Sequence, residues 1–217
     1  MSHPHNKIVI WRHGQTDWNI ENRFQGSTDI PLNETGVAQV ARAGKLLTGL
    51  SPSQIIASDL SRAYSTAKAL ADLVNLDITK DKRLRETDGG NWEGKTGDAI
   101  RETDIENFIR WIDGDDNRAG EIGERRSDVA KRATEAIYEA LDGKINHTLV
   151  VATHGGTARC ILGKMLEMPM TQWSSIGGLS NASWSILESG HHRDGWVLVE
   201  HNAGSLPEPI YGEESGA

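Results

Sequence analysis

The sequence reads Ile8-Val9-Ile10-Trp11-Arg12-His13-Gly14-Gln15-Thr16 near its beginning, and this stretch decides the fold. Its apolar start is typical of a buried parallel strand, and Gly14 marks a tight turn at the strand end. In open α/β sheets, ligands bind just beyond the carboxyl ends of the strands. Arg12, a fixed positive charge, and His13, a candidate nucleophile or acid–base group, are therefore expected where a ligand binds. Taken alone, Arg-His-Gly could equally be an ordinary turn with a solvated arginine.

The same pattern returns later in the chain. The apolar run 148–152 is the strongest predicted strand, and it leads into Thr153-His154-Gly155-Gly156. A helix with an apolar stripe follows, as helical spacing of its apolar residues indicates. If the two strands are neighbours in the sheet, the two His-Gly turns bring His13 and His154 together.

Strands and helices alternate between these two turns, which predicts an α/β fold. Asn33 is the expected N-cap of a first helix that ends near Gly49, and a strand follows over 54–58. Arg62 falls in the first turn of the next helix, on the side away from its apolar stripe, where a cation opposes the helix dipole. A brief strand over 76–79, a long helix that starts at Ser127 or Asp128, and two final strands over 182–187 and 196–201 complete the pattern. The apolar stripes of the three helices are expected to be Val37, Val40, Ala41, Gly44 and Leu47; Leu60, Ala63, Ala67, Leu70 and Val74; and Val129, Ala133, Ala136, Ile137, Ala140 and Leu141.

Two polar stretches carry further candidates. The loop 17–31 contains Asn19, Arg23 and Gln25, whose side chains could reach a ligand held by Arg12. Glu86 precedes a glycine-punctuated loop over 87–94, a weak helix from Thr96 to about Trp111, and an acidic, glycine-bearing connection over 113–123. The segment 87–123, a small helical and loop insertion, is where we expect substrate specificity to lie. Mobile tails are expected at about 1–6 and 208–217.

Composition limits the classes of partner. The chain has 217 residues with 31 acidic and 23 basic side chains, a formal net charge of -8, and these values favour one domain over 1–217 that binds no nucleic acid. No apolar run is long enough for a membrane span, and no signal-peptide core is present. Cys160 is the only cysteine, and we expect it to be a small core residue. A cytoplasmic protein with a small-molecule substrate is predicted. No metal or cofactor is expected, because neither a metal-ligand spacing nor a phosphate-binding Gly-Lys-Ser/Thr loop occurs.

The candidate residues form one chemical set: Arg12, His13, Arg62, Glu86 and His154. Arginine matches phosphate oxygens with a planar, permanently charged fork. A neutral imidazole is a competent nucleophile toward phosphorus, and fixed donors stabilise the charge that develops during transfer. A carboxyl outside the cationic cluster can protonate the leaving alkoxide and later deprotonate the attacking water. The set therefore suits phosphoryl transfer without a metal.

Several of these stretches resemble the histidine phosphatase superfamily, the phosphoglycerate mutase-like proteins. The resemblance rests on residues 12–19, 58–63, 84–86, 123–124 and 153–156, which follow one another in the family's order between about 7 and 187. It implies a mostly parallel central sheet flanked by helices on both faces. It also implies that His13 is the phosphohistidine nucleophile and Glu86 the proton donor. The implied phosphate pocket consists of Arg12, Arg62, His154, Asn19 and the Gly155 amide, with Gln25 as a further candidate contact.

The resemblance favours the phosphatase branch. Mutases of this family carry Glu-Arg-His-Tyr-Gly at the acid and then a long insertion, whereas Glu86 is followed here by Thr87-Asp88-Gly89-Gly90. Arg125-Arg126-Ser127 resembles a mutase substrate clamp superficially but fits a helix start better. The stretches 83–87 and 176–184 are similar to actinobacterial members that dephosphorylate glucosyl-3-phosphoglycerate, which makes this ester, or another small phosphorylated metabolite, the candidate substrate. A cofactor-dependent phosphoglycerate mutase and a catalytically silent phosphate-binding module stay open as alternatives.

Tryptophan is over-represented among the aromatic residues, with seven Trp against three Tyr and two Phe. Trp11, Trp18, Trp92 and Trp111 could line a substrate mouth, although core positions are the ordinary alternative. A homodimer is possible, and Trp173 and Trp184 are candidates for its contact.

Overall fold

The computed structural model describes residues 5–189 and 195–204. In this part of the chain, one six-stranded sheet has the strand order β3-β2-β4-β1-β5-β6. Strands β3, β2, β4 and β1 run parallel, and β5 and β6 extend the sheet with antiparallel pairings. This confirms the expected α/β architecture. The strands are β1 (Lys7–Arg12), β2 (Gln54–Ala57), β3 (Ile78–Lys80), β4 (Thr148–Thr153), β5 (Trp184–Glu188) and β6 (Val197–Ala203).

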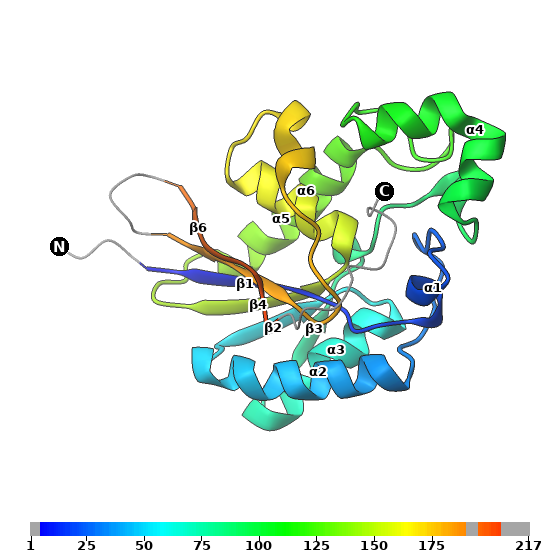
Figure 1. The fold of residues 1–217 in the computed structure, drawn as a ribbon. Helices are drawn as coiled ribbons and strands as arrows, with labels where there is room; N and C mark the ends of the chain where they lie inside the picture. The colour runs from blue at the N-terminus through cyan, green and yellow to red at the C-terminus, as the bar shows by residue number, and fades with distance from the viewer. Residues whose placement is uncertain (1–4, 190–194, 205–217) are drawn as a thin grey trace.

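Helices cover both faces of the sheet (Figure 1). Helices α2 (Glu34–Leu47) and α3 (Ser61–Val74) lie on one face, and α5 (Arg126–Leu141) and α6 (Gly155–Met165) lie on the other. The shorter helical elements are α1 (Asp17–Ile20) and α4 (Gly97–Ile112), with the 3-10 turns η1 (Thr48–Leu50), η2 (Lys82–Leu84), η3 (Gly90–Trp92) and η4 (Met170–Ser175). No helix among the described residues is long and apolar enough to cross a membrane.

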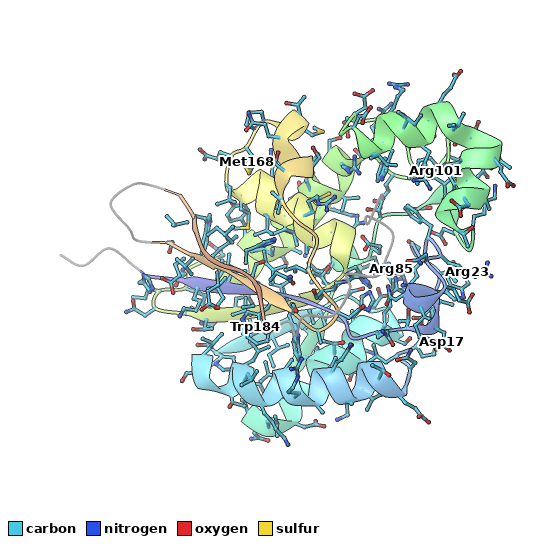
Figure 2. The ribbon with its side chains drawn as sticks, in the orientation of Figure 1. Asp17, Arg23, Arg85, Arg101, Met168 and Trp184 are labelled. Atoms are coloured by element: carbon cyan, nitrogen blue, oxygen red, sulfur yellow. The ribbon has the colours of Figure 1, made fainter. Side chains whose placement is uncertain are left out.

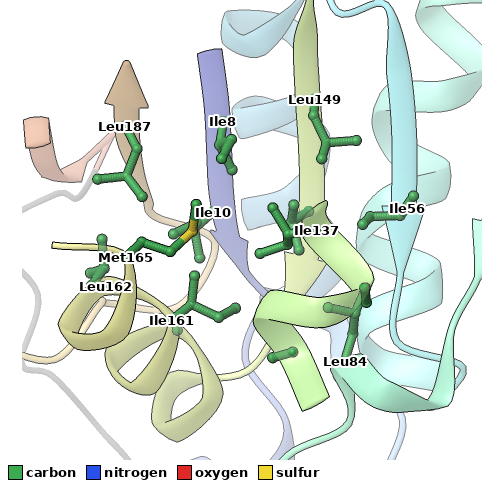
Figure 3. Close-up of a cluster of buried hydrophobic side chains, with 14 of the residues drawn as sticks. Ile8, Ile10, Ile56, Leu84, Ile137, Leu149, Ile161, Leu162, Met165 and Leu187 are labelled. Atoms are coloured by element: carbon green, nitrogen blue, oxygen red, sulfur yellow. The ribbon is translucent and has the colours of Figure 1, made fainter. Parts of the chain in front are cut away.

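Strand β1 supplies both layers of the core because its successive side chains point to opposite faces. Ile8 and Ile10 belong to the cluster under α5 and α6, and Val9 and Trp11 belong to the cluster under α2 and α3. Figure 3 shows the first cluster, with Ile10 beside Ile161 and Met165 of α6. The four consecutive apolar residues 8–11 of β1 are therefore what a strand buried on both faces requires.

The register of β1 against β4 positions the two His-Gly turns. The strands are parallel, and Arg12 is paired with Thr153 at their carboxyl ends. The next residues, His13 and His154, therefore leave the sheet side by side. The two strands are neighbours, so the condition under which the two His-Gly turns meet is fulfilled.

The predicted inward face of α2 is partly wrong. Asn33 caps the helix as expected, because its side chain accepts a hydrogen bond of 2.8 Å from the Gly36 amide. Val37 is 56% exposed, and Ala41 is exposed as well, whereas Gly36 and Ala43 are buried. A Cβ built on Gly36 would lie 2.1 Å from the Gln15 carbonyl oxygen. This close approach of two backbones fixes which side of α2 faces the core. The apolar pattern alone does not predict it.

Other boundaries differ by a few residues. The loop 17–31 contains the short helix α1. A capping box formed by Thr16 and Asn19 stabilises the N-terminus of this helix. Helix α5 begins at Arg126, slightly before the predicted start, and this confirms that 125–127 is a helix start. Cys160 is buried in α6, as expected. The predicted tail 208–217, most of the predicted tail 1–6 and most of the turn 189–195 lie outside the described residues.

The segment 87–123 is more ordered than its sequence suggests. Helix α4 confirms the weak helix, although Asp104 interrupts it with non-helical backbone angles (φ -154°, ψ 46°). The segment has a small apolar cluster that Phe24 of the loop 17–31 completes; its other members are Trp92, Ile100, Phe108, Trp111 and Ala119.

Three of the four tryptophans suggested for a substrate mouth do not line one. Trp11, Trp92 and Trp111 are buried in apolar clusters, and only Trp18 of that group is half-buried. Trp173 and Trp184 are also buried within the chain, at 4% and 7% exposure, so neither offers a dimer contact.

Candidate active site

The structure brings the five predicted chemical residues to the carboxyl ends of β1 and β4. All five are buried, with exposed fractions of 6% for Arg12, 3% for His13, 0% for Arg62, 4% for Glu86 and 0% for His154. The rings of His13 and His154 lie 5.2 Å apart between centroids. Residues from four separate stretches of the chain thus share one desolvated site. Figure 2 shows Arg23 and Arg85 at the end of the molecule where β1 leads into α1, far from Met168.

One ring nitrogen of His13 is engaged by the backbone, and the other is left with its lone pair. Its Nδ1 lies 2.7 Å from the carbonyl oxygen of Gly14. A carbonyl only accepts, so Nδ1 must carry the proton and Nε2 must carry the lone pair. Burial, followed by the nearby charges of Arg62 and Arg12, lowers the pKa of His13 well below its ordinary value. The imidazole is therefore neutral at physiological pH, as nucleophilic attack requires.

His154 is also neutral. Burial, and next the charge of Arg62, lowers its pKa well below the ordinary value. Its Nε2 lies 2.9 Å from the Oγ atom of Ser58, which directly follows β2. Its Nδ1 is buried and has no hydrogen-bond partner in the part of the chain that the structure describes. The second imidazole thus has one nitrogen available for a ligand.

Arg12 and Arg62 are held in place by backbone carbonyls. Arg12 donates to the carbonyl oxygen of Leu179 at 2.5 Å. Arg62 donates to the carbonyl oxygens of Gly26 and Thr28, both at 2.8 Å. The sequence placed Arg62 away from the apolar stripe of α3, and the structure shows that it points into the interior. Two cations fixed in this way create an anion site that needs little reorganisation.

Helix α6 begins directly at the site. A Cβ built on Gly155 would lie 3.4 Å from the Cζ and Nε atoms of Arg12, so the helix start lies against this guanidinium. The free amides of a helix N-terminus attract anions. The amides of Gly156 and Thr157 donate to Glu86, each at 3.0 Å. The carboxylate of Glu86 is thereby fixed at the start of α6, directly after His154.

Arg132 of α5 holds the backbone that carries Glu86. It donates to the carbonyl oxygens of Arg83, Arg85 and Glu86, and it forms a two-pronged ion pair with Glu124. This pair lowers the pKa of Glu124, although burial of the carboxyl opposes the shift. Sequence reasoning missed Arg132 because no local pattern distinguishes it from other helix cations.

Asn19 and Gln25 are both connected to the turn after β1. Asn19 accepts hydrogen bonds from Thr16 and Asn181, and Gln25 accepts one from the Thr16 hydroxyl at 3.1 Å. The Nδ2 atom of Asn19 is buried without a partner among the described residues, so this donor is available to a ligand. Arg23, also suggested from the loop, instead binds Glu21 and the Gly94 carbonyl. Asn181 was missed, although it lies in the stretch 176–184 that the sequence singled out.

Glu93 links the segment 87–123 to the side of the site that carries Arg62. Its carboxylate accepts from the amides of Ser27, Thr28 and Gly89 at 2.7, 3.1 and 3.1 Å, and from the Thr28 hydroxyl at 2.5 Å. Gly26, with φ +53°, approaches it so closely that a Cβ there would lie 2.1 Å from Oε1. The same loop carries the two carbonyls that hold Arg62.

Among residues 5–189 and 195–204, no group of three or more His, Cys, Asp or Glu side chains is arranged to hold a metal ion. What the site offers instead is a neutral nucleophile, two guanidiniums, a second imidazole and a carboxylate. This combination can bind a tetrahedral anion and transfer it in two steps.

Comparison with known proteins agrees with this geometry. The sequence profile of the histidine phosphatase superfamily (branch 1) matches residues 8–204. The chain is 36% identical over 197 residues to a glucosyl-3-phosphoglycerate phosphatase of Mycobacterium tuberculosis, which covers 87% of each chain. It is 31% identical over 195 residues to a probable phosphoglycerate mutase of Salmonella choleraesuis, which covers 88% of this chain and 90% of that protein.

A solved structure shows the same fold. The mycobacterial glucosyl-3-phosphoglycerate phosphatase in complex with VO3 matches with a TM-score of 0.84 and 36% identity, over 91% of this chain and 98% of that one. Profile, sequence and structure agree over most of the chain, and we conclude that it belongs to the histidine phosphatase superfamily.

Proposed function

We propose that this protein hydrolyses a small phosphomonoester in two steps through a phosphohistidine at His13. The observation that carries the proposal is the state of His13. Its Nδ1 is tied to the Gly14 carbonyl, so a neutral Nε2 lone pair remains beside Arg12 and Arg62. A nucleophile of this kind, next to two fixed cations, is suited to attack on phosphorus.

In the first step, His13 Nε2 forms a bond to phosphorus while the bond from phosphorus to the ester oxygen breaks. Arg12 and Arg62 stabilise the negative charge on the phosphoryl oxygens, with Asn19, His154 and the Gly155 amide as further donors. Gln25 accepts a hydrogen bond from the hydroxyl of Thr16. Glu86, in its protonated form, gives its proton to the leaving alkoxide. The products of this step are the free alcohol, phosphohistidine and a Glu86 carboxylate.

In the second step, water attacks the phosphohistidine. Glu86 takes a proton from this water, the bond between phosphorus and Nε2 breaks, and inorganic phosphate leaves. His13 regains its neutral form and Glu86 its proton, so the cycle closes without another reactant.

We infer that the substrate is glucosyl-3-phosphoglycerate or another small phosphorylated metabolite. The relatives named for this activity support the inference, as does the stretch 176–184, which supplies Leu179 and Asn181 to the site. The main alternative is a phosphoglycerate mutase, which one relative's name favours. A cytoplasmic location and a homodimer stay predictions from the sequence.

The test is a panel of phosphate esters without added metal at pH 5 to 8. It contains 4-nitrophenyl phosphate, 3-phosphoglycerate and glucosyl-3-phosphoglycerate. We expect one ester to be hydrolysed far faster than the others, and His13→Ala to reduce kcat by about 10³-fold or more, because the covalent route is lost. His147→Ala, outside the site, serves as the matched control and should leave kcat unchanged.

Two further results separate the alternatives. Interconversion of phosphoglycerates that a bisphosphate stimulates, measured in an enolase-coupled assay, would support the mutase. Phosphate that protects the fold from heat, with no turnover of any ester, would support a binding module. Unchanged activity in His13→Ala would refute the proposed nucleophile.

A further inference from the structure

Ser58 makes a contact with His154 that the reaction steps above do not use. The Oγ atom of Ser58 is 2.9 Å from His154 Nε2, and both side chains are fully buried. The same Oγ accepts a hydrogen bond from the amide of Leu60 at 3.3 Å. Ser58 directly follows β2 and Leu60 precedes α3, so the hydroxyl is fixed by the backbone of this turn.

The donors and acceptors around the Ser58 hydroxyl favour one tautomer of His154. A backbone amide only donates, so the Leu60 contact uses a lone pair of Ser58 and leaves its proton for another partner. Among the described residues, His154 Nε2 is the acceptor in reach of that proton. A neutral imidazole that accepts at Nε2 carries its proton at Nδ1. The opposite tautomer would leave the hydroxyl proton buried without an acceptor, which costs free energy.

We propose that Ser58 is a positioning residue that holds His154 in its Nδ1-protonated tautomer, so that Nδ1–H donates to a phosphoryl oxygen. The buried Nδ1 without a partner supports this assignment, because a donor in that state is ready for a ligand oxygen. The last step rests on the proposed function, since it requires a phosphoryl group in the site. The tautomer itself does not.

The two histidines then use the same tautomer for opposite purposes. The Gly14 carbonyl keeps the proton of His13 on Nδ1, which leaves the Nε2 lone pair for attack. The Ser58 hydroxyl keeps the proton of His154 on Nδ1, which leaves an N–H for binding. One imidazole is thereby a nucleophile and its neighbour a neutral donor.

The experiment is a long-range ¹H–¹⁵N NMR spectrum of the histidine rings, which distinguishes the two tautomers directly. The wild type, Ser58→Ala and Ser58→Thr are compared, and His154→Asn assigns the signals. We expect Nδ1–H for His154 in the wild type and in Ser58→Thr. In Ser58→Ala, a mixture or the Nε2–H form is expected. Added inorganic phosphate should shift the Nδ1 signal of the wild type.

Kinetics provide the second readout. We expect kcat of Ser58→Ala to fall by about tenfold with a smaller change in KM, and Ser58→Thr to stay within about threefold of the wild type. Ser53→Ala, an exposed serine before β2, is the control for a general effect of removing a hydroxyl.

An Nε2–H tautomer in the wild type would overturn the proposal, and so would a Ser58→Ala variant with unchanged tautomer and kcat. A phosphate-insensitive Nδ1 signal would overturn the donation to phosphate. If Ser58→Ala does not fold, the spectra of the wild type and Ser58→Thr still decide the tautomer. Because these spectra need no substrate, a failed ester panel would refute the proposed function without deciding this assignment.

Discussion

The pocket at the strand ends and the segment 87–123 differ in how they are built. The pocket is assembled on β1, β4 and the start of α6. Its chemical side chains are buried and hydrogen-bonded to backbone, except that His154 contacts the Ser58 hydroxyl. The segment 87–123 has an interrupted helix, a separate small apolar cluster and mostly polar surface positions. One region is part of the main core, and the other is a small unit placed beside it.

The difference separates two tasks. Groups that act on the phosphoryl oxygens need fixed geometry, which strand ends and helix starts provide. Groups that recognise the alcohol part of a substrate can vary, and a segment with its own small core can change without disturbing the sheet. Among the contacts that join the two regions are those of Glu124 with Asp88 and Arg132, and those of Glu93 with the loop 26–28. Variants at these joints test how independent the regions are.

The largest effect is expected at Arg132. Lysine keeps the charge in Arg132→Lys but cannot reach the three carbonyls and the carboxylate that the guanidinium binds, so Glu86 should lose its fixed position. We expect kcat to fall by about 30-fold, with a smaller change in KM. Steady-state kinetics on the preferred ester measure this, with the exposed neighbour Lys131→Arg as control. An unchanged kcat would mean that Glu86 keeps its position without the contacts of Arg132.

A smaller effect is expected at Glu93. The amide nitrogen of Glu93→Gln would face a backbone N–H, so the loop 26–28 should lose part of its anchor and Arg62 should become less fixed. We expect inorganic phosphate to inhibit about tenfold more weakly, because Arg62 is proposed to bind the phosphoryl oxygens. Product inhibition measures this, and Glu102→Gln on the exposed side of α4 is the matched control. Equal inhibition in both variants would show that the segment does not influence the pocket.

The smallest effect concerns pH and belongs to the pocket alone. The pKa values of His13 and His154 are lowered well below 6.5, so at pH below 6.5 the unfolded chain binds more protons than the folded one. The free energy of unfolding should therefore decrease as the pH falls below 6.5. We expect Tm to drop by about 5 °C between pH 6.5 and 5.5, and by less in His13→Asn. Thermal unfolding followed by circular dichroism measures Tm of both proteins at each pH. An equal fall of Tm in the wild type and in His13→Asn would show that His13 does not cause the pH dependence.

The two regions also differ in how far their sequences predict them. The strand and turn around His13 and those around His154 are local patterns. These patterns do not by themselves determine that β1 pairs with β4, which the structure shows. Glu93 and Arg132 could not be identified, because their partners lie 66 and 46 positions away along the chain. The inward face of α2 was missed for a similar reason, since a backbone contact between Gly36 and Gln15 decides it. Periodicity reports which residues are apolar but not which backbones approach each other.

The position of β1 in the sheet also has a consequence for biosynthesis. The ribosome makes this strand early, yet both of its neighbours, β4 (148–153) and β5 (184–188), come much later. Until they emerge, Ile8, Val9 and Ile10 have no strand on either edge, and contacts between such distant segments form slowly. A nascent chain therefore cannot complete the pocket, and its exposed apolar strand is a natural substrate for chaperones that bind unfolded segments.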